Sequence, residues 1–169
     1  KDVVLQNGKA YAFPNIVLKE NPMRPVIVGA GPAGLTAAVY ALRAGKTVLV
    51  IEKAGFGGQI AFSPKVENIP GTIQISGAEF ADKLTEQAMA LGADMELETV
   101  TAVEKTENGF RVSTEDGAEF EGRTVILALG VKHRMLGLPG EEELIGSGIS
   151  FCAVCDGAFY AGQDVAMIG

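Results

Sequence analysis

Tryptophan is absent from this chain of 169 residues, cysteine occurs twice, and histidine occurs once. A structural zinc site normally takes four ligands, whereas the two cysteines and His133 supply at most three Cys or His side chains. We therefore do not expect a zinc site within one chain, and we predict no bound metal. The two cysteines need an explanation other than zinc binding.

Basic residues are outnumbered by acidic ones, 14 Lys and Arg against 21 Asp and Glu, which gives a formal net charge of −7. This balance argues against nucleic acid and against an anionic membrane surface as partners. No apolar run approaches the roughly 20 residues of a membrane span, and the N-terminus has no signal-peptide pattern. We therefore predict a cytoplasmic protein. The chain begins at Lys1 rather than at a methionine, which indicates a tag, processing or residues upstream.

A glycine-rich turn joins an apolar, β-type segment to a helix-forming one. Gly29, Gly31 and Gly34 occupy its first, third and sixth positions, the spacing that places a pyrophosphate on a helix N-terminus. Gly29 permits the tight turn, Gly31 lets the backbone approach a phosphate, and Gly34 lets helix and strand pack closely. Pro32 suits the first helical turn, where its missing N–H costs nothing.

The predicted helix ends at Ala44-Gly45, and a second strand follows from Thr47 to Ile51. Glu52 comes next, about 20 positions beyond the glycines, where a dinucleotide fold binds the adenosine ribose hydroxyls. The charge of Glu52 disfavours a 2′-phosphate, so the turn predicts FAD or NAD rather than NADP. The alternative is a plain tight bend. The dinucleotide-binding turn is favoured because a strand, a helix, a second strand and an acidic residue follow one another in the expected order.

The segments around this core follow local patterns. Residues 1–25 contain an Asn7-Gly8 hairpin signal, and we interpret them as a tether or edge ribbon, with a linker from an upstream domain as the alternative. Residues 53–76 form a long glycine- and proline-containing loop, which we expect to fold over a ligand. The remaining predictions are a helix over Gly77–Gly92 and strands over Met95–Val103, Gly109–Thr114, Ala118–Phe120 and Thr124–Leu129, the last buried on both faces.

The second chemical feature is the pair Cys152 and Cys155, followed at once by Asp156. Three-residue spacing lets two sulfurs close a small ring reversibly, and the helix dipole depresses one thiol pKa in such pairs. A carboxyl group beside the pair can exchange a proton with a leaving thiolate. The alternatives are that the cysteines are small buried apolar residues and that the acid is a turn former.

As a set, these residues resemble the N-terminal half of the low-molecular-weight thioredoxin reductases, FAD-dependent members of the pyridine nucleotide-disulfide oxidoreductases. The matching stretches keep the order of that family over about residues 25 to 169: Gly29–Gly34, Gly57-Gly58-Gln59, Val66–Gly71, Leu136–Pro139 with the acidic run Glu141–Glu143, and Cys152–Asp156. The resemblance implies an α/β, Rossmann-like FAD/NAD(P)-binding fold with a parallel sheet and a small antiparallel crossover layer, followed by the start of a second nucleotide-binding domain.

The resemblance also implies three regions. Residues 1–25 are an N-terminal extension, 26–139 the first segment of an FAD-binding domain, and 140–169 the beginning of an NADPH and redox-disulfide domain. Val165–Gly169 looks like the first strand of that second domain, so the NADPH site lies outside this chain. We therefore expect residues 1–169 by themselves not to turn over NADPH. A hinge between the domains is expected at Gly137–Gly140, with a rigid turn as the alternative.

Carried over residue by residue, the resemblance implies that the FAD site is formed by Gly29, Gly31, Pro32, Ala33, Gly34, Glu52, Lys53, Gly57, Gly58, Gln59, Asn68, Ala128 and Gly130. Asn68 is expected near the isoalloxazine. One departure is Ala128-Leu129-Gly130, where the family has Ala-Thr-Gly, so an apolar side chain replaces a threonine hydroxyl.

In that family the cysteine matching Cys152 attacks a disulfide of the partner, the one matching Cys155 faces the flavin, and the acid matching Asp156 donates a proton. The implied protein is an NADPH-dependent thioredoxin-disulfide reductase that acts on a thioredoxin-like protein as a homodimer. The alternatives are a peroxiredoxin-reductase-type or ferredoxin-linked flavoprotein of the same fold, and a non-catalytic FAD-binding fragment.

Overall fold

The computed structural model describes residues 3–6, 9–12 and 24–168. The chain divides into two compact units, Lys1–Gly130 and Val131–Gly169. Among the described residues, the first unit contains three sheets and both long helices. The second contains three short helical segments and a bridge between Ile145 and Ile149. The functional boundary between residues 139 and 140 stays a prediction.

The N-terminal segment contains a β-hairpin. Strands β1 (Val3–Gln6) and β2 (Lys9–Ala12) pair antiparallel, with Gln6 opposite Lys9. This pairing confirms the hairpin that the Asn-Gly signal predicts. The predicted turn residues, Asn7 and Gly8, lie outside the described residues.

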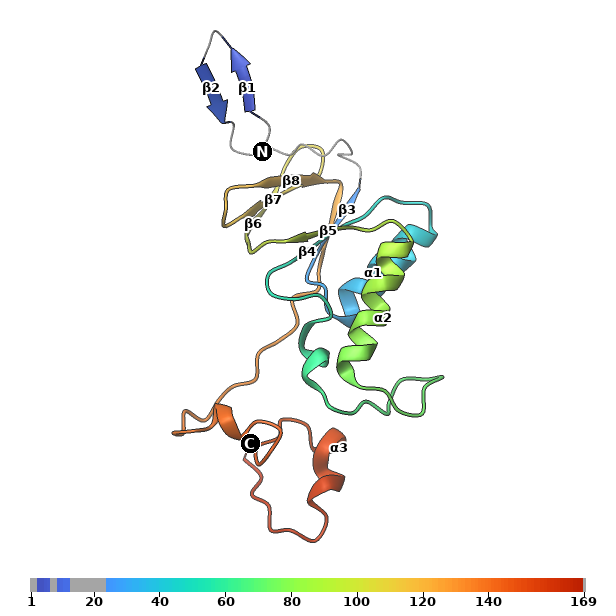
Figure 1. Cartoon of the computed structure of the whole chain (residues 1–169), viewed down its shortest axis with the longest axis vertical. Helices are drawn as coiled ribbons and strands as arrows, with labels where there is room; N and C mark the ends of the chain where they lie inside the picture. Colours follow the sequence, from blue (N-terminus) through green and yellow to red (C-terminus); the bar gives the residue numbers. More distant parts are fainter. Residues whose placement is uncertain (1–2, 7–8, 13–23, 169) are drawn as a thin grey trace. The chain divides into compact units, whose positions relative to one another are not determined.

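A parallel sheet forms the middle of the first unit (Figure 1). Its strand order is β5-β4-β3-β9, so β9, the last strand of this sheet in the sequence, lies beside β3, the first. In the register, Val26 lies opposite Leu49 on one side and Val125 on the other. The strand bounds are β3 (Pro25–Val28), β4 (Leu49–Glu52), β5 (Asp94–Leu97) and β9 (Thr124–Leu127).

Two helices connect the parallel strands and lie side by side (Figure 1). Helix α1 (Pro32–Arg43) follows the glycine turn and ends where Gly45 adopts a φ of 72°, as predicted. Helix α2 (Gly77–Ala90) is capped by Ser76, whose Oγ accepts a hydrogen bond of 3.1 Å from the backbone N–H of Glu79. That bond satisfies one of the N–H groups that the start of a helix leaves without a partner.

A second, antiparallel sheet forms the predicted crossover layer. Its strands are β6 (Val100–Lys105), β7 (Phe110–Thr114) and β8 (Glu119–Gly122). The Asp116-Gly117 turn between β7 and β8 is confirmed: Gly117 has a φ of 86°, and Asp116 Oδ1 accepts from the backbone N–H of Ala118 at 3.1 Å.

The prediction of one strand over Met95–Val103 is wrong. The chain pairs with β4 from Asp94 to Leu97, and from Val100 onward it pairs with β7 instead. The segment is therefore two strands, β5 and β6, in different sheets. Both halves have strand composition, so the local pattern did not reveal the break. Pairing with two separate partners decides it.

Alternation along β3 and β4 builds an apolar core on each face of the parallel sheet. One face packs against the helices: Ile27, Val48 and Val50 with Leu35, Ala38, Val39 and Ala88. The opposite face packs against the antiparallel sheet: Val26, Val28, Leu49 and Ile51 with Val112 and Phe120. The first unit therefore has three layers, helices, parallel sheet and antiparallel sheet.

The strand predicted over Thr124–Leu129 departs from its prediction. It ends at Leu127, and the side chains of Leu127 and Leu129 are 60% and 67% exposed rather than buried on both faces. Within the described residues β9 pairs only with β3, so it is an edge strand. Apolar composition predicted burial, but an edge strand has fewer neighbours to cover it.

The loop predicted over residues 53–76 folds into η1 (Gly58–Phe62) and a bridge between Val66 and Ile75. The second unit holds η2 (Glu142–Leu144), α3 (Ala153–Asp156) and η3 (Gly157–Tyr160). Residues 164–168 form no strand, contrary to the prediction for Val165–Gly169, because no described segment pairs with them. Among the described helices, none has the length and apolar character that a membrane crossing needs.

We predict that Leu35→Ala lowers the free energy of unfolding by about 2 to 5 kcal/mol, since Leu35 is fully buried and its truncation leaves a cavity. The control is Met89→Ala on α2, where 58% of the side chain is already exposed, and the expected loss is below about 1 kcal/mol. Urea unfolding followed by circular dichroism measures both. Equal losses would contradict the assignment of Leu35 to the core.

Candidate functional site

The glycine turn is fixed by backbone contacts at the carboxyl end of the parallel sheet. Gly29 has a φ of 102°, and its N–H donates to the carbonyl of Ile51 at 2.8 Å. A Cβ on Gly29 would collide with the carbonyl oxygen of Ala128, and one on Gly34 with that of Gly29. These two positions therefore require glycine because of the protein's own backbone.

Gly31 is different, since no protein atom lies within 4 Å of the place where its Cβ would be. Its φ of −73° is open to any residue, and it is the N-cap of α1 without a side-chain cap. The N–H groups of Ala33 and Gly34 follow in the first helical turn, where no carbonyl of the helix can accept them. The space beside Gly31 suits an anion, because these donors and the positive end of the helix dipole meet there.

Glu52 is held at the end of β4 by backbone donors. Its Oε2 accepts from the N–H of Ala30 at 2.8 Å, and its Oε1 from those of Lys53 and Ala54 at 2.9 and 3.1 Å. The side chain is half-buried, and each carboxylate oxygen has two lone pairs. Glu52 therefore retains the capacity to accept a hydroxyl hydrogen from a ligand.

The loop after β4 closes onto the turn through two more glycines. The N–H of Gly57 donates to the carbonyl of Ala30 at 2.8 Å, and a Cβ on Gly57 would collide with the side chain of Ala81 in α2. A Cβ on Gly58 would lie 3.0 Å from the Cα of Gly31. Both glycines have positive φ angles, 103° and 66°.

The structure thus gathers most of the predicted cofactor-binding residues at one edge: Gly29, Gly31, Pro32, Ala33, Gly34, Glu52, Gly57, Gly58 and Ala128. Lys53 contributes its backbone N–H to Glu52, while Gln59 and Asn68 are exposed on the following loop. Gly130 has a φ of 63° and ends the first unit. The arrangement fits a dinucleotide, because three features occur together: N–H groups that can donate to phosphates, space for the phosphates to approach, and a carboxylate that can accept from a ribose hydroxyl.

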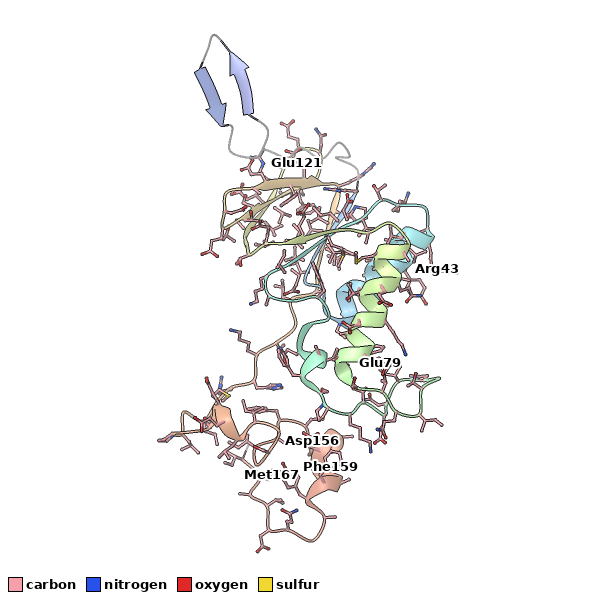
Figure 2. All side chains as sticks on the ribbon, in the orientation of Figure 1. Arg43, Glu79, Glu121, Asp156, Phe159 and Met167 are labelled. Atoms are coloured by element: carbon pink, nitrogen blue, oxygen red, sulfur yellow. The ribbon has the colours of Figure 1, made fainter. Side chains whose placement is uncertain are left out.

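The cysteine segment belongs to the second unit. Cys152 directly precedes α3, and Cys155 lies within that helix, with the N–H of Asp156 donating to the carbonyl of Cys152 at 3.0 Å. Asp156, labelled in Figure 2, ends the same turn. Its Oδ2 accepts from the hydroxyl of Ser150 at 2.6 Å. Sequence reasoning gave Ser150 no role, although Ser two residues before Cys152 has the spacing of a side-chain turn.

Glu141 is a second residue whose role the sequence did not reveal. Its side chain is only 3% exposed, and its carboxylate accepts the N–H groups of Leu136, Gly137 and Leu138 at 2.7, 2.7 and 3.1 Å. The bond from Leu136, helped by those from Leu138 and Gly137, holds the pKa of Glu141 below its ordinary value, although burial opposes the shift. These bonds favour a rigid turn here, and a hinge at Gly137–Gly140 stays a prediction.

A ring contact joins two other parts of the second unit. The rings of His133 and Phe151 stack with centroids 4.3 Å apart and planes 2° from parallel. Phe151 directly precedes Cys152, so the stack connects the start of the unit to the cysteine segment. Among the described residues, no three His, Cys, Asp or Glu side chains form a group that suits a metal ion.

The model of one protein family, described as pyridine nucleotide-disulphide oxidoreductase, matches residues 23–169. The chain belongs to this family. Similar members include a thioredoxin reductase from Treponema pallidum, 46% identical over 85% of the chain and 47% of the relative. A bifunctional thioredoxin reductase/thioredoxin from Mycobacterium leprae is also 46% identical, over 85% of the chain and 32% of the relative. The resemblance stated from the sequence is confirmed.

Solved structures of the family agree with the fold. Thioredoxin reductase from Streptococcus pyogenes matches with a TM-score of 0.78 and 44% identity, over 83% of this chain and 46% of that one. The enzyme from Lactococcus lactis matches with a TM-score of 0.66 and 41% identity, over 82% and 45%. The α/β, Rossmann-like fold is therefore confirmed. The chain spans about half the length of these relatives, or less.

We predict that the turn at residues 136–141 depends on an ionised Glu141. Because folding lowers this pKa, the contribution to stability is complete above the unfolded-state pKa and disappears as the pH falls through the lower folded-state pKa. Glu141→Gln should speed amide hydrogen exchange at Leu136 and Gly137 at neutral pH, since one amide oxygen cannot accept three N–H groups well. Glu143→Gln, a change in an exposed neighbour, is the control and should leave these rates unchanged. Unaltered exchange in Glu141→Gln would refute the assigned role.

Proposed function

We propose that the whole protein is a flavoprotein disulfide reductase of the thioredoxin-reductase type. In this proposal NADPH is the electron donor, FAD is the bound carrier, and the Cys152-Cys155 pair passes the electrons to a thioredoxin-like protein. The observation that carries the proposal is the presence, in one chain, of a dinucleotide cradle and a Cys-x-x-Cys-Asp segment. The relatives named thioredoxin reductase, at 46% identity, support the same reaction.

The residues gathered at the carboxyl edge of the parallel sheet would hold FAD. The N–H groups that follow Gly31 would bind the pyrophosphate, and the carboxylate of Glu52 would accept a ribose hydroxyl. Ala128 and Gly130 would border the cofactor through their backbone, and Gln59 and Asn68 would contribute from the loop after Gly58. When bound, FAD supplies a carrier that accepts electrons as hydride from a nicotinamide and delivers them to a disulfide.

The dithiol chemistry is assigned to the second unit. The thiolate of Cys152 attacks one sulfur of the partner's disulfide, forms a mixed disulfide, and releases the other sulfur as a thiolate. Cys155 then attacks the Cys152 sulfur, which releases the reduced partner and leaves a Cys152-Cys155 disulfide. The two electrons that the partner gains come from the dithiol, and reduction of this disulfide restores it.

Asp156 is the proposed proton donor in this exchange. A protonated carboxyl next to the cysteines gives its proton to the departing thiolate and regains one from water. Asp156 is half-buried and lies in α3 with Cys155, and its backbone N–H donates to the carbonyl of Cys152 at 3.0 Å. It is therefore close to the cysteine segment in sequence and in structure. A thiolate that is protonated as it leaves does not attack back.

NADPH would bind outside residues 1–169, in the second nucleotide-binding domain that begins near residue 140. The substrate is proposed to be thioredoxin-like, since the relative from Mycobacterium leprae combines a reductase with thioredoxin. We also propose a homodimer that works in the cytoplasm. We do not favour the peroxiredoxin-reductase, ferredoxin-linked or non-catalytic alternatives, because the similar proteins named above are thioredoxin reductases.

We predict that Gly31→Val in the whole protein keeps the fold but lowers FAD affinity at least tenfold, about 1.4 kcal/mol or more. A Cβ at this position has no protein atom within 4 Å, yet the valine side chain would fill the space that the phosphates need. The control, Gly148→Val, introduces the same side chain in the second unit at a position with ordinary neighbours, and it should retain FAD. Flavin absorbance per protein, with melting temperature as the check on folding, measures both. Full flavin content in Gly31→Val would exclude this site.

We predict that Cys152→Ser and Cys155→Ser each abolish thioredoxin reduction by the whole protein, since either change removes one half of the disulfide exchange. The matched control is Ala153→Ser, which places the same hydroxyl between the cysteines at an exposed position and should stay active. NADPH oxidation in the presence of oxidised thioredoxin is the assay. Normal turnover by both cysteine variants would rule out the dithiol route.

A further inference from the structure

The hydroxyl of Ser150 joins the two ends of the cysteine segment. Its Oγ accepts from the N–H of Cys152 at 3.1 Å, and it lies 2.6 Å from Oδ2 of Asp156 and 3.4 Å from the carbonyl oxygen of Cys152. A serine hydroxyl has one hydrogen to donate, and a carboxylate at the shorter distance is the stronger acceptor. Ser150 therefore donates to Asp156 and accepts from Cys152.

This pair of bonds orients the side chain of Asp156 and involves Cys152 through its backbone N–H. The backbone of Asp156 is already held by its N–H bond to the carbonyl of Cys152, but its side chain could still rotate. The bond from Ser150 fixes Oδ2, so the second oxygen, Oδ1, is left for proton exchange. Asp156 lies on α3 in Figure 2, and Ser150 precedes that helix.

We propose that Ser150 is a positioning residue for proton transfer by Asp156. This inference rests on the proposed function. In the exchange, Oδ1 of protonated Asp156 gives its hydrogen to the thiolate that leaves the partner's disulfide. The hydroxyl of Ser150 donates to Oδ2 and stabilises the negative charge that remains on the carboxylate. Asp156 then regains a proton from water. Ser150 neither gains nor loses a proton overall.

The test compares two reactions of the whole protein. The first is NADPH-dependent turnover of oxidised thioredoxin, whose leaving thiolate is basic and needs a proton. The second is the stoichiometric reaction of the pre-reduced protein with an aromatic disulfide, 5,5′-dithiobis(2-nitrobenzoate), whose leaving thiolate departs unprotonated. A residue that acts through the proton donor should affect only the first reaction.

The expected result for Ser150→Ala is a fall in kcat with thioredoxin of about tenfold, part of the contribution of general acid catalysis, with KM changed less than about twofold. The aromatic disulfide should react at the wild-type rate. Ser150→Thr, which keeps the hydroxyl, should recover most of the turnover. Ser147→Ala, a change in an exposed serine of the same unit, is the control and should leave both reactions unchanged.

A double-mutant cycle checks that Ser150 acts through Asp156. The double variant with Ser150→Ala and Asp156→Asn should turn over thioredoxin no more slowly than the Asp156→Asn variant. The inference would be overturned if the losses of the two changes were additive or if Ser150→Ala slowed both reactions equally. It would also be overturned if the wild-type protein were active and Ser150→Ala were equally active. A wild-type protein that does not reduce thioredoxin with NADPH would instead overturn the proposed function, and the role of Ser150 with it.

Discussion

Close backbone packing between the glycine turn and the end of β9 is the constraint on which the first unit depends. Gly29 faces the carbonyl of Ala128, and Gly34 faces the carbonyl of Gly29, at separations that leave no room for a Cβ. The turn and the start of α1 are therefore held against the backbone at the end of β9. The same contact requires β9 to lie beside β3, which the chain reaches only after completing the antiparallel sheet.

Two buried or half-buried glutamates organise turns in the same way, with different consequences. Glu52 and Glu141 each accept three backbone N–H groups, so each carboxylate replaces the partners that a turn otherwise lacks. Glu52 is still partly accessible and can serve a ligand as well. Glu141 is almost fully buried, so its contribution is confined to the fold of the second unit.

The cradle and the cysteine segment differ in how they are built. The cradle combines three segments that are up to about one hundred residues apart, Gly29–Gly34, Glu52–Gly58 and the end of β9. Such a combination would let the proposed dinucleotide be contacted from several sides. The cysteine segment is local, since the hydrogen bonds among Ser150, Cys152 and Asp156 span only residues 150–156. The proposed dithiol exchange needs only correct spacing and one proton donor, which a single helical turn would supply.

The sequence by itself determined the features that depend on local chemistry. The spacing of three glycines predicted the turn and the start of α1, apolar periodicity predicted α2, and Asp116-Gly117 predicted the β7-β8 turn. Each of these follows from the conformations that a few neighbouring residues allow. The same holds for the placement of two cysteines about one helical turn apart, at the start of α3.

Only the tertiary structure decided the features that depend on distant partners. It divided Met95–Val103 between two sheets, placed β9 at an edge, and gave Glu141 and Ser150 their hydrogen-bond partners. An apolar strand can have the same composition at the centre and at the edge of a sheet. Likewise, the identity of an acidic residue does not reveal whether it lies in solvent or accepts hydrogen bonds within a turn. What surrounds each residue is settled by packing, because burial and hydrogen bonding depend on which groups the fold brings near.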